Sequence, residues 1–187
     1  LTGWSGSSIP RFILGPSLGF LSEIKLYFAQ RNSKKKVNFI LKDLKVDKEL
    51  AKDALYNQLS PSTFNALRIA KQVTEIAEKT DAKFIITTYE GHAWERLVYY
   101  CARRSDPSIK CFGYQHVAVF MHQKAIKRPL SKQYNPDIIL TSGKISLSIF
   151  RDSKLLKNSN IFCLGSPKYL KPKLMLDRVG CCLVVPQ

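Results

Sequence analysis

The polar residues best suited to chemistry stand directly after short apolar runs. Glu90 comes shortly after the run Phe84–Thr88, and His116 comes shortly after the run Lys110–Tyr114. A carboxylate beside an imidazole orients and charges the ring, and such a pair can take a proton from a hydroxyl group. A carboxylate can also be the nucleophile of a group transfer. We therefore take Glu90 and His116 as the candidate catalytic residues.

Glycine and further hydrogen-bonding residues follow the same apolar runs. Glycine lets a ligand approach the backbone closely, and free N–H groups at the start of a following helix attract anions such as phosphate. The candidate substrate-binding residues are Gly91, Glu95, Gln115, Gly143, Gly165, Ser166 and Lys168.

Each candidate also has a purely structural interpretation. Glu90 would cap the helix that follows it. Glu95 would lie in the first turn of the same helix, where the positive end of the helix dipole stabilises a carboxylate. A lone histidine is most often a hydrogen-bonded core residue, but the place of His116 beside Gln115 at a strand end favours a functional role. The three histidines are scattered, and no carboxylates are paired at ligand spacing. We therefore expect no metal site.

Short apolar runs after residue 81 predict the sheet that would position these residues. Their centres are 21 to 27 residues apart, about one strand plus one helix. Strands that are apolar on both faces and alternate with helices predict an α/β fold: a Rossmann-like parallel sheet with helices on both faces. Ligands of such sheets bind beyond the carboxyl ends of the strands. The runs are Phe84–Thr88, Lys110–Tyr114, Asp137–Thr141, Asn160–Leu164 and Cys181–Val185.

Helical spacing of apolar residues predicts the elements between and before the strands. The lysine run Lys34–Lys36 indicates a solvated loop, and Val37–Leu41 fits a short strand or the start of a helix. Residues 117–136 have no core stripe and are typical of a functional loop or lid with a short helix of its own. The predicted helices are Leu18–Gln30, Ser62–Lys79, His92–Arg104 and Lys144–Leu156.

The charge of the chain favours an anionic partner. Its 187 residues include 30 Lys and Arg against 14 Asp and Glu, a net charge of +16. Between Phe120 and Lys173 there are 11 basic and 2 acidic residues. Nucleic acid, an anionic membrane surface and acidic or phosphorylated sugars all fit this balance, as does a surface solvated by lysine. The signatures of nucleic-acid modules are missing, so we expect no nucleic acid as partner.

Several other classes are excluded by missing motifs. The chain has no dinucleotide fingerprint, P-loop, G-x-S-x-G elbow or H-E-x-x-H, which argues against dehydrogenases, NTPases, α/β-hydrolases and zincins. An odd number of cysteines, five, without a C-x-x-C motif indicates a reducing compartment, and so a cytoplasmic protein. No apolar run approaches the 18 or so residues of a membrane span.

An ordered set of motifs resembles a known family. The chain is similar to bacterial surface-carbohydrate-biosynthesis glycosyltransferases of the two-domain GT-B fold, near the retaining β-Kdo transferases. The similarity covers about residues 84–185 and is weak before residue 80. The motifs that carry it are Tyr89–Arg96 (YEGHAWER), Gly113–His116 (GYQH), Pro136-Asp137, Gly143 and Leu164–Tyr169 (LGSPKY).

The resemblance implies an N-terminal Rossmann-like domain at 1–165, a linker at 166–180 and the first strand of a second domain at 181–187. It implies transfer of a sugar from a nucleotide-sugar, a CMP-linked sugar among the options, to a glycan or lipid-linked acceptor of cell-surface polysaccharide or lipopolysaccharide. It implies no cofactor and no metal. Most of the second domain would be missing, so we expect the chain alone to be inactive. The expected place is the cytoplasm, with peripheral contact at the inner face of the cell membrane.

Two other functions remain open at this stage. A nucleotide-sugar epimerase of the same fold would turn over the donor without an acceptor. A non-catalytic basic domain would bind nucleic acid or another polyanion through charge alone, and its binding would weaken steeply with salt.

Overall fold

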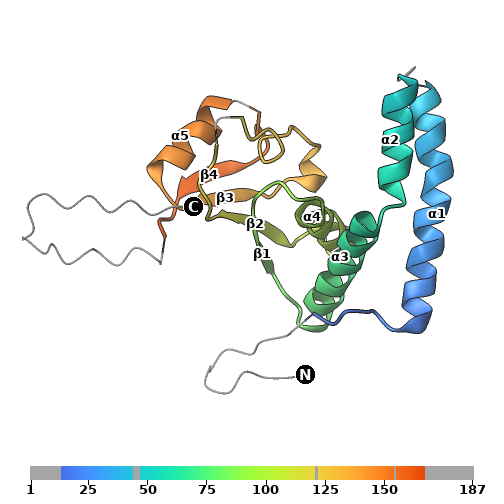
Figure 1. Ribbon diagram of the computed structural model, residues 1–187. Helices are drawn as coiled ribbons and strands as arrows, with labels where there is room; N and C mark the ends of the chain where they lie inside the picture. Colours follow the sequence, from blue (N-terminus) through green and yellow to red (C-terminus); the bar gives the residue numbers. More distant parts are fainter. Residues whose placement is uncertain (1–13, 44–46, 121, 154, 167–187) are drawn as a thin grey trace, which may run out of the picture.

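The computed structural model describes residues 14–43, 47–120, 122–153 and 155–166 (Figure 1). Lys168, the predicted strand Cys181–Val185 and the predicted linker beyond Ser166 lie outside these residues. Within the described ranges no helix is both long enough and apolar enough to cross a membrane.

Four parallel strands form one sheet in the order β1-β2-β3-β4. This confirms the α/β prediction and four of the five predicted strands, with ends that shift by a single residue. The strand β2 continues to Gln115, so this candidate is the last residue of a strand. The strands are β1 (Phe84–Thr88), β2 (Lys110–Gln115), β3 (Ile138–Thr141) and β4 (Asn160–Cys163).

The helices of the sheet domain are close to their predicted positions. Helix α3 (Pro61–Lys79) begins after the N-cap Ser60, whose hydroxyl accepts the N–H of Thr63, and packs along α4 (Ala93–Ser105). Helix α5 (Lys144–Ser153) connects β3 to β4. The connection from β2 to β3 is a long loop, and the only regular element among its described residues is a 3₁₀ turn, η1 (Lys132–Tyr134), which confirms the predicted loop with a short helix of its own.

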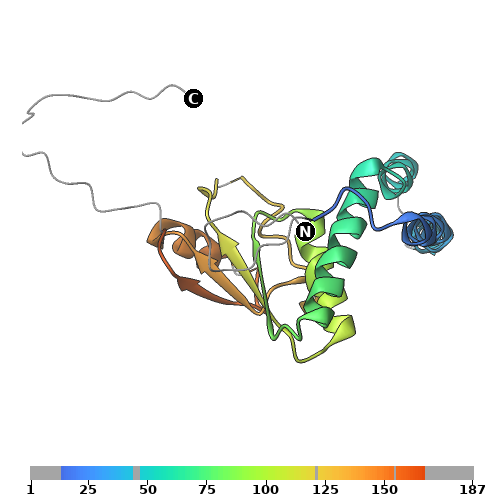
Figure 2. The ribbon, with the colours of Figure 1, turned by 90° about the horizontal axis from the view of Figure 1, so that it is seen from below.

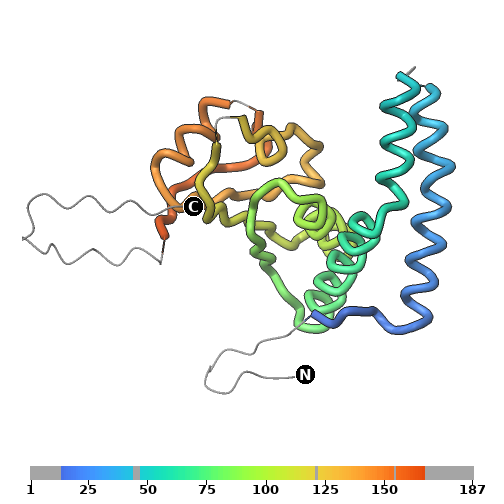
Figure 3. Tube along the Cα trace, in the orientation of Figure 1, coloured from blue at the N-terminus to red at the C-terminus, as the bar shows by residue number. Residues whose placement is uncertain are grey.

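The predicted helix Leu18–Gln30 is confirmed in part, but its predicted end is too early, and a helix at Lys48–Gln58 was not predicted. Helix α1 runs from Phe20 to Asp43, so Lys34–Lys36 is helical and not a loop, and Val37–Leu41 belongs to the same helix. No glycine or proline interrupts these 24 residues, and lysine is a good helix former. Helix α2 (Lys48–Gln58) lies beside α1, and the two form a hairpin that stands beside the sheet domain (Figure 3).

Helices cover one face of the described sheet, which corrects the prediction of helices on both faces. Ile85, Cys111 and Ile139 point to the covered face and are buried under α4 and α5. Phe84 and Ile86 point the other way and are exposed, and no described helix lies over them (Figure 2). The reason is topological. The strands lie side by side in the order in which they follow along the chain. Because crossovers between parallel strands are right-handed, all of their connections then lie on the same face of the sheet.

A partly buried ion pair fixes the far end of the β2–β3 loop. The Arg103 guanidinium lies 3.0 Å from the Asp137 carboxylate and also donates to the carbonyl of Asn135 at 2.8 Å. Burial alone would raise the pKa of Asp137, but the Cys111 N–H and Arg103 outweigh burial and hold that pKa below its ordinary value. The stability that Asp137 contributes is therefore present above the ordinary aspartate range and is lost as the pH falls through the lowered pKa. The motif residue Asp137 thus has a structural role here.

Candidate functional site

The Glu90 carboxylate lies between two imidazole rings at the carboxyl edge of the sheet. Its Oε1 is 3.5 Å from Nε2 of His116, and its Oε2 is 3.1 Å from Nε2 of His92. Because β1 and β2 are neighbouring parallel strands, the residues that follow them meet at one edge. The predicted proximity of Glu90 and His116 is confirmed. His92 is the residue that sequence reasoning missed.

These three side chains face solvent and remain accessible to a ligand. The side chains of Glu90 and His116 are 30% and 32% exposed, and that of His92 is more exposed still. The His116 ring lies nearly parallel to the ring of Tyr114, with 6.2 Å between centroids. The Tyr114 hydroxyl donates to the carbonyl of Gly165 at 3.1 Å, which brings Gly165 to this edge as well.

Glu95 holds the loop that carries Glu90. Its side chain is fully buried, and its two carboxylate oxygens accept the N–H groups of Glu90, Gly91 and His92 at 2.9 to 3.1 Å. Burial raises the pKa of Glu95, while the three N–H bonds oppose that rise. The expectation that free N–H groups at Gly91 would receive an anion is therefore wrong for this structure. Glu95 already occupies them and acts as a positioning residue.

Gly91 is where the long β2–β3 loop touches the site. Its φ of +88° lies in the left-handed region, and a Cβ there would be 2.5 Å from the N of Ile126 and 2.6 Å from the C of Ala125. The loop is fixed at this contact by the Tyr89 hydroxyl, which donates to the Ile126 carbonyl at 3.1 Å. Arg96, buried with its guanidinium 4.8 Å from the centroid of the Tyr89 ring, donates to the same carbonyl. The loop after β1 and the β2–β3 loop thus pack closely against each other at Gly91.

The other candidates occupy three positions at or below this edge. Gly143 follows β3 and precedes α5, and a Cβ there would meet nothing within 4 Å, so the backbone is open to a ligand. Ser166 is half-buried just after Gly165, beyond β4. Gln115 is 1% exposed and lies under the edge, and neither its amide N nor its amide O has a hydrogen-bond partner in the described part of the chain.

We expect the unpartnered amide of Gln115 to cost stability. Burying a polar group without a partner costs about 1–3 kcal/mol, and methionine has a similar length without that cost. Gln115→Met should therefore leave the free energy of unfolding unchanged or raise it by about 1 kcal/mol. Urea denaturation measures this. A loss of more than about 2 kcal/mol would mean that the amide has a partner in the folded protein.

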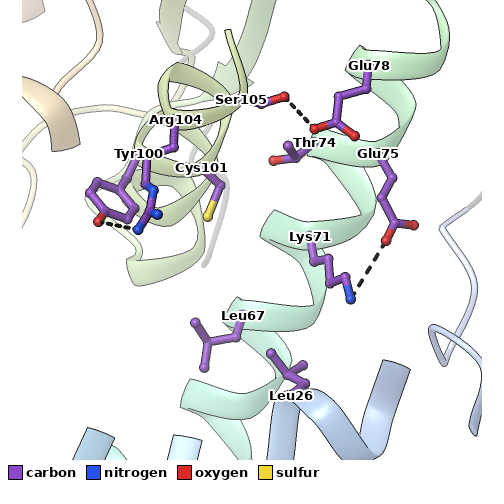
Figure 4. A pocket seen from close by; sticks show the side chains of 10 residues that line it. All are labelled: Leu26, Leu67, Lys71, Thr74, Glu75, Glu78, Tyr100, Cys101, Arg104 and Ser105. Atoms are coloured by element: carbon purple, nitrogen blue, oxygen red, sulfur yellow. Dashed lines mark hydrogen bonds and ion pairs between the residues drawn. The ribbon is translucent and has the colours of Figure 1, made fainter. Parts of the chain in front are cut away.

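A separate hollow of about 470 Å³ lies between α1, α3 and α4 (Figure 4). Its charged side chains already have partners: Lys71 pairs with Glu75, Arg104 donates to the Tyr100 hydroxyl, and Ser105 donates to Glu78. Because these groups already have partners, we assign no ligand to this hollow.

Chemically, the edge offers a carboxylate with an imidazole on each side. Such a group can accept a proton from a bound hydroxyl and share it with a ring nitrogen. Among the described residues no group of three or more His, Cys, Asp and Glu is arranged to hold a metal ion. The sequence signal that could have identified His92 is its position two residues after Glu90. Because Gly91 between them adopts a left-handed φ, the side chains of residues 90 and 92 can point toward each other.

Comparison with known proteins gives no family for this chain. No model of a protein family matches it. No curated protein and no solved structure is significantly similar to it.

Proposed function

We propose that this chain is part of a glycosyltransferase that transfers a sugar from a nucleotide-sugar to a glycan or lipid-linked acceptor of a cell-surface polysaccharide or lipopolysaccharide. The observation that carries the proposal is the Glu90 carboxylate between His116 and His92 at the open carboxyl edge of a parallel sheet. Sheets of this type bind their ligands at that edge. The proposed donor is a nucleotide-sugar, a CMP-linked sugar among the options, and the proposal includes no cofactor.

In the proposed reaction, the bond between the anomeric carbon and the donor phosphate breaks, and a new bond forms to an acceptor hydroxyl. The hydroxyl proton goes to Glu90 or, through it, to His116, and the nucleotide leaves with the electron pair of the broken bond. If the anomeric configuration is retained, Glu90 is instead the nucleophile of a first step, in which it bonds to the anomeric carbon and the nucleotide leaves with the electron pair of the broken bond. In the second step the acceptor hydroxyl attacks the anomeric carbon, the bond to Glu90 breaks, and the hydroxyl proton goes to His116. The open backbone at Gly143, before α5, supports binding of the leaving phosphate.

A basic hollow supports an acidic substrate. It measures about 590 Å³ and lies between the β2–β3 loop and the end of α5. No carboxylate is among the described residues that line it, so its field attracts anions such as carboxylated or phosphorylated sugars. The residues around it are His122, Lys124, Lys127, Arg128, Pro129, Ser153 and Leu155.

Nucleotide release by the full-length protein tests the proposal. We expect release from a nucleotide-sugar only when a glycan acceptor is present, at a cytoplasmic pH near 7. Turnover of the donor without any acceptor would indicate an epimerase. No turnover, together with binding to heparin or RNA that weakens steeply with salt, would indicate a polyanion-binding domain. Either result would overturn the proposal.

A further inference from the structure

Helix α1 carries apolar side chains on two sides, and only one side has a partner. On the inner side Gln30 is buried and its amide donates to the carbonyl of Gln58 at 2.7 Å, at the end of α2. Glu23 forms an ion pair with Arg68 of α3 at 2.8 Å on the same side. These contacts fix the rotation of α1 about its own axis, so that the opposite side of the helix faces solvent.

The outer side of α1 is rich in exposed aromatic residues. Phe20 is 79% exposed and Phe39 is 73% exposed. At about 100° per residue, six large apolar side chains fall within about 120° of arc along the whole helix. We call them the α1 aromatic face: Phe20, Leu21, Ile24, Tyr27, Phe28 and Phe39.

Positive charge lies among these apolar residues. At the same 100° per residue, Arg31, Lys35 and Lys42 fall on the same arc as the α1 aromatic face. The helix has six basic and two acidic residues, a net charge of +4, and one of the acids is Glu23, which is paired on the inner side. Exposed aromatic rings can enter the headgroup region of a membrane, and long Lys and Arg side chains beside them can extend their charged ends to lipid phosphates, so this side of α1 is suited to lie against a membrane surface.

Charge and shape favour lipid over a second copy of the chain. Two copies packed through this face would bring together two helices of +4 each, in a protein of net charge +16. An anionic lipid surface satisfies both features, because rings enter the boundary between headgroups and acyl chains while Lys and Arg meet phosphates. The hairpin of α1 and α2 stands beside the sheet domain, so the outer side of α1 can reach a flat surface (Figures 1 and 3).

We propose that the α1 aromatic face docks this protein on a membrane surface of anionic phospholipids, with α1 parallel to the membrane plane. This docking is independent of any chemistry at Glu90. If the protein is a glycosyltransferase, it would place the chain where lipid-linked acceptors lie.

Cosedimentation of residues 1–187 with vesicles tests the docking. We expect binding to an equal mixture of phosphatidylcholine and phosphatidylglycerol, and at least ten-fold weaker binding to phosphatidylcholine alone. The double variant Phe20→Ser/Phe28→Ser should reduce binding to the mixture by ten-fold or more. The matched control is Phe84→Ser/Ile86→Ser, which removes two equally exposed apolar side chains from the bare face of the sheet and should leave binding unchanged.

Three outcomes would overturn the proposal. One is no binding to the anionic vesicles, and another is equal loss of binding in the α1 variant and the sheet variant. The third is a dimer of the wild-type chain by light scattering that becomes a monomer in Phe20→Ser/Phe28→Ser, since a second copy would then cover this face. Circular dichroism of each variant confirms that it is folded. None of these results depends on sugar transfer, so docking and transfer fail separately.

Discussion

Glu90→Gln should reduce turnover of the full-length protein by about 100-fold or more while the protein remains folded. Glutamine keeps the size of the side chain but cannot accept the proton of an acceptor hydroxyl or act as a nucleophile. His116→Ala should have a similar effect, because Nε2 of His116 lies 3.5 Å from the Glu90 carboxylate and, in the proposed reaction, takes up the proton that Glu90 accepts. The measurements are nucleotide release and the melting temperature of each variant.

Glu75→Gln is the matched control for charge. This carboxylate is on α3, where it pairs with Lys71 at 3.9 Å, away from the carboxyl edge of the sheet. We expect normal turnover for it. If Glu90→Gln and His116→Ala instead melt early but keep normal activity per folded molecule, both residues serve as structural supports and the site assignment is wrong.

The second large effect is expected at Gly91, where alanine should destabilise the protein by about 2–5 kcal/mol. Part of this cost is the left-handed φ of +88°, at about 1–2 kcal/mol for a residue with a Cβ. The rest is overlap with the backbone of Ala125 and Ile126, because backbone cannot move aside as a flexible side chain would. Urea denaturation gives the free energy of unfolding.

A Gly19→Ala variant distinguishes the cost of the left-handed φ from the cost of overlap with the β2–β3 loop. The φ of Gly19 is +89°, almost that of Gly91, but a Cβ there would meet nothing within 4 Å. Gly19→Ala should therefore lose only about 1–2 kcal/mol. Equal losses at both positions would mean that the β2–β3 loop does not contact Gly91, and the link between the loop and the site would be wrong.

The sheet and its carboxyl edge were predictable because strand order follows from local pattern. Apolar runs separated by a single helix or one long loop leave few strand orders open, and right-handed crossovers reduce their number further. The same rule, applied to strands that advance in one direction, would also have predicted a single covered face. We instead inferred covered faces from strands that look apolar on both sides. The exposed Phe84 and Ile86 show that an apolar side chain in a strand need not be covered by a helix of the same domain.

The roles of individual side chains were harder to predict, because they depend on contacts between distant segments. The approach of Ile126 to Gly91 spans 35 residues and leaves no periodic trace in the sequence. The sequence supports both a substrate-binding and a structural interpretation of Glu95, and three N–H bonds to its carboxylate select the structural one. The lysine run of α1 predicts a loop only if charge is weighed above helix propensity, and no helix breaker interrupts the segment.

The most direct test of the central claim, that Glu90 and His116 act together on one reacting group, is a double-mutant cycle on turnover. Nucleotide release is measured for the wild type, Glu90→Gln, His116→Ala and the double variant. If the two residues share one proton, the double variant should be no slower than the slower single variant, because either change alone already removes the function of the pair. If the two losses multiply, to about 10⁴-fold from two losses of about 100-fold, the residues act independently and the claim is contradicted.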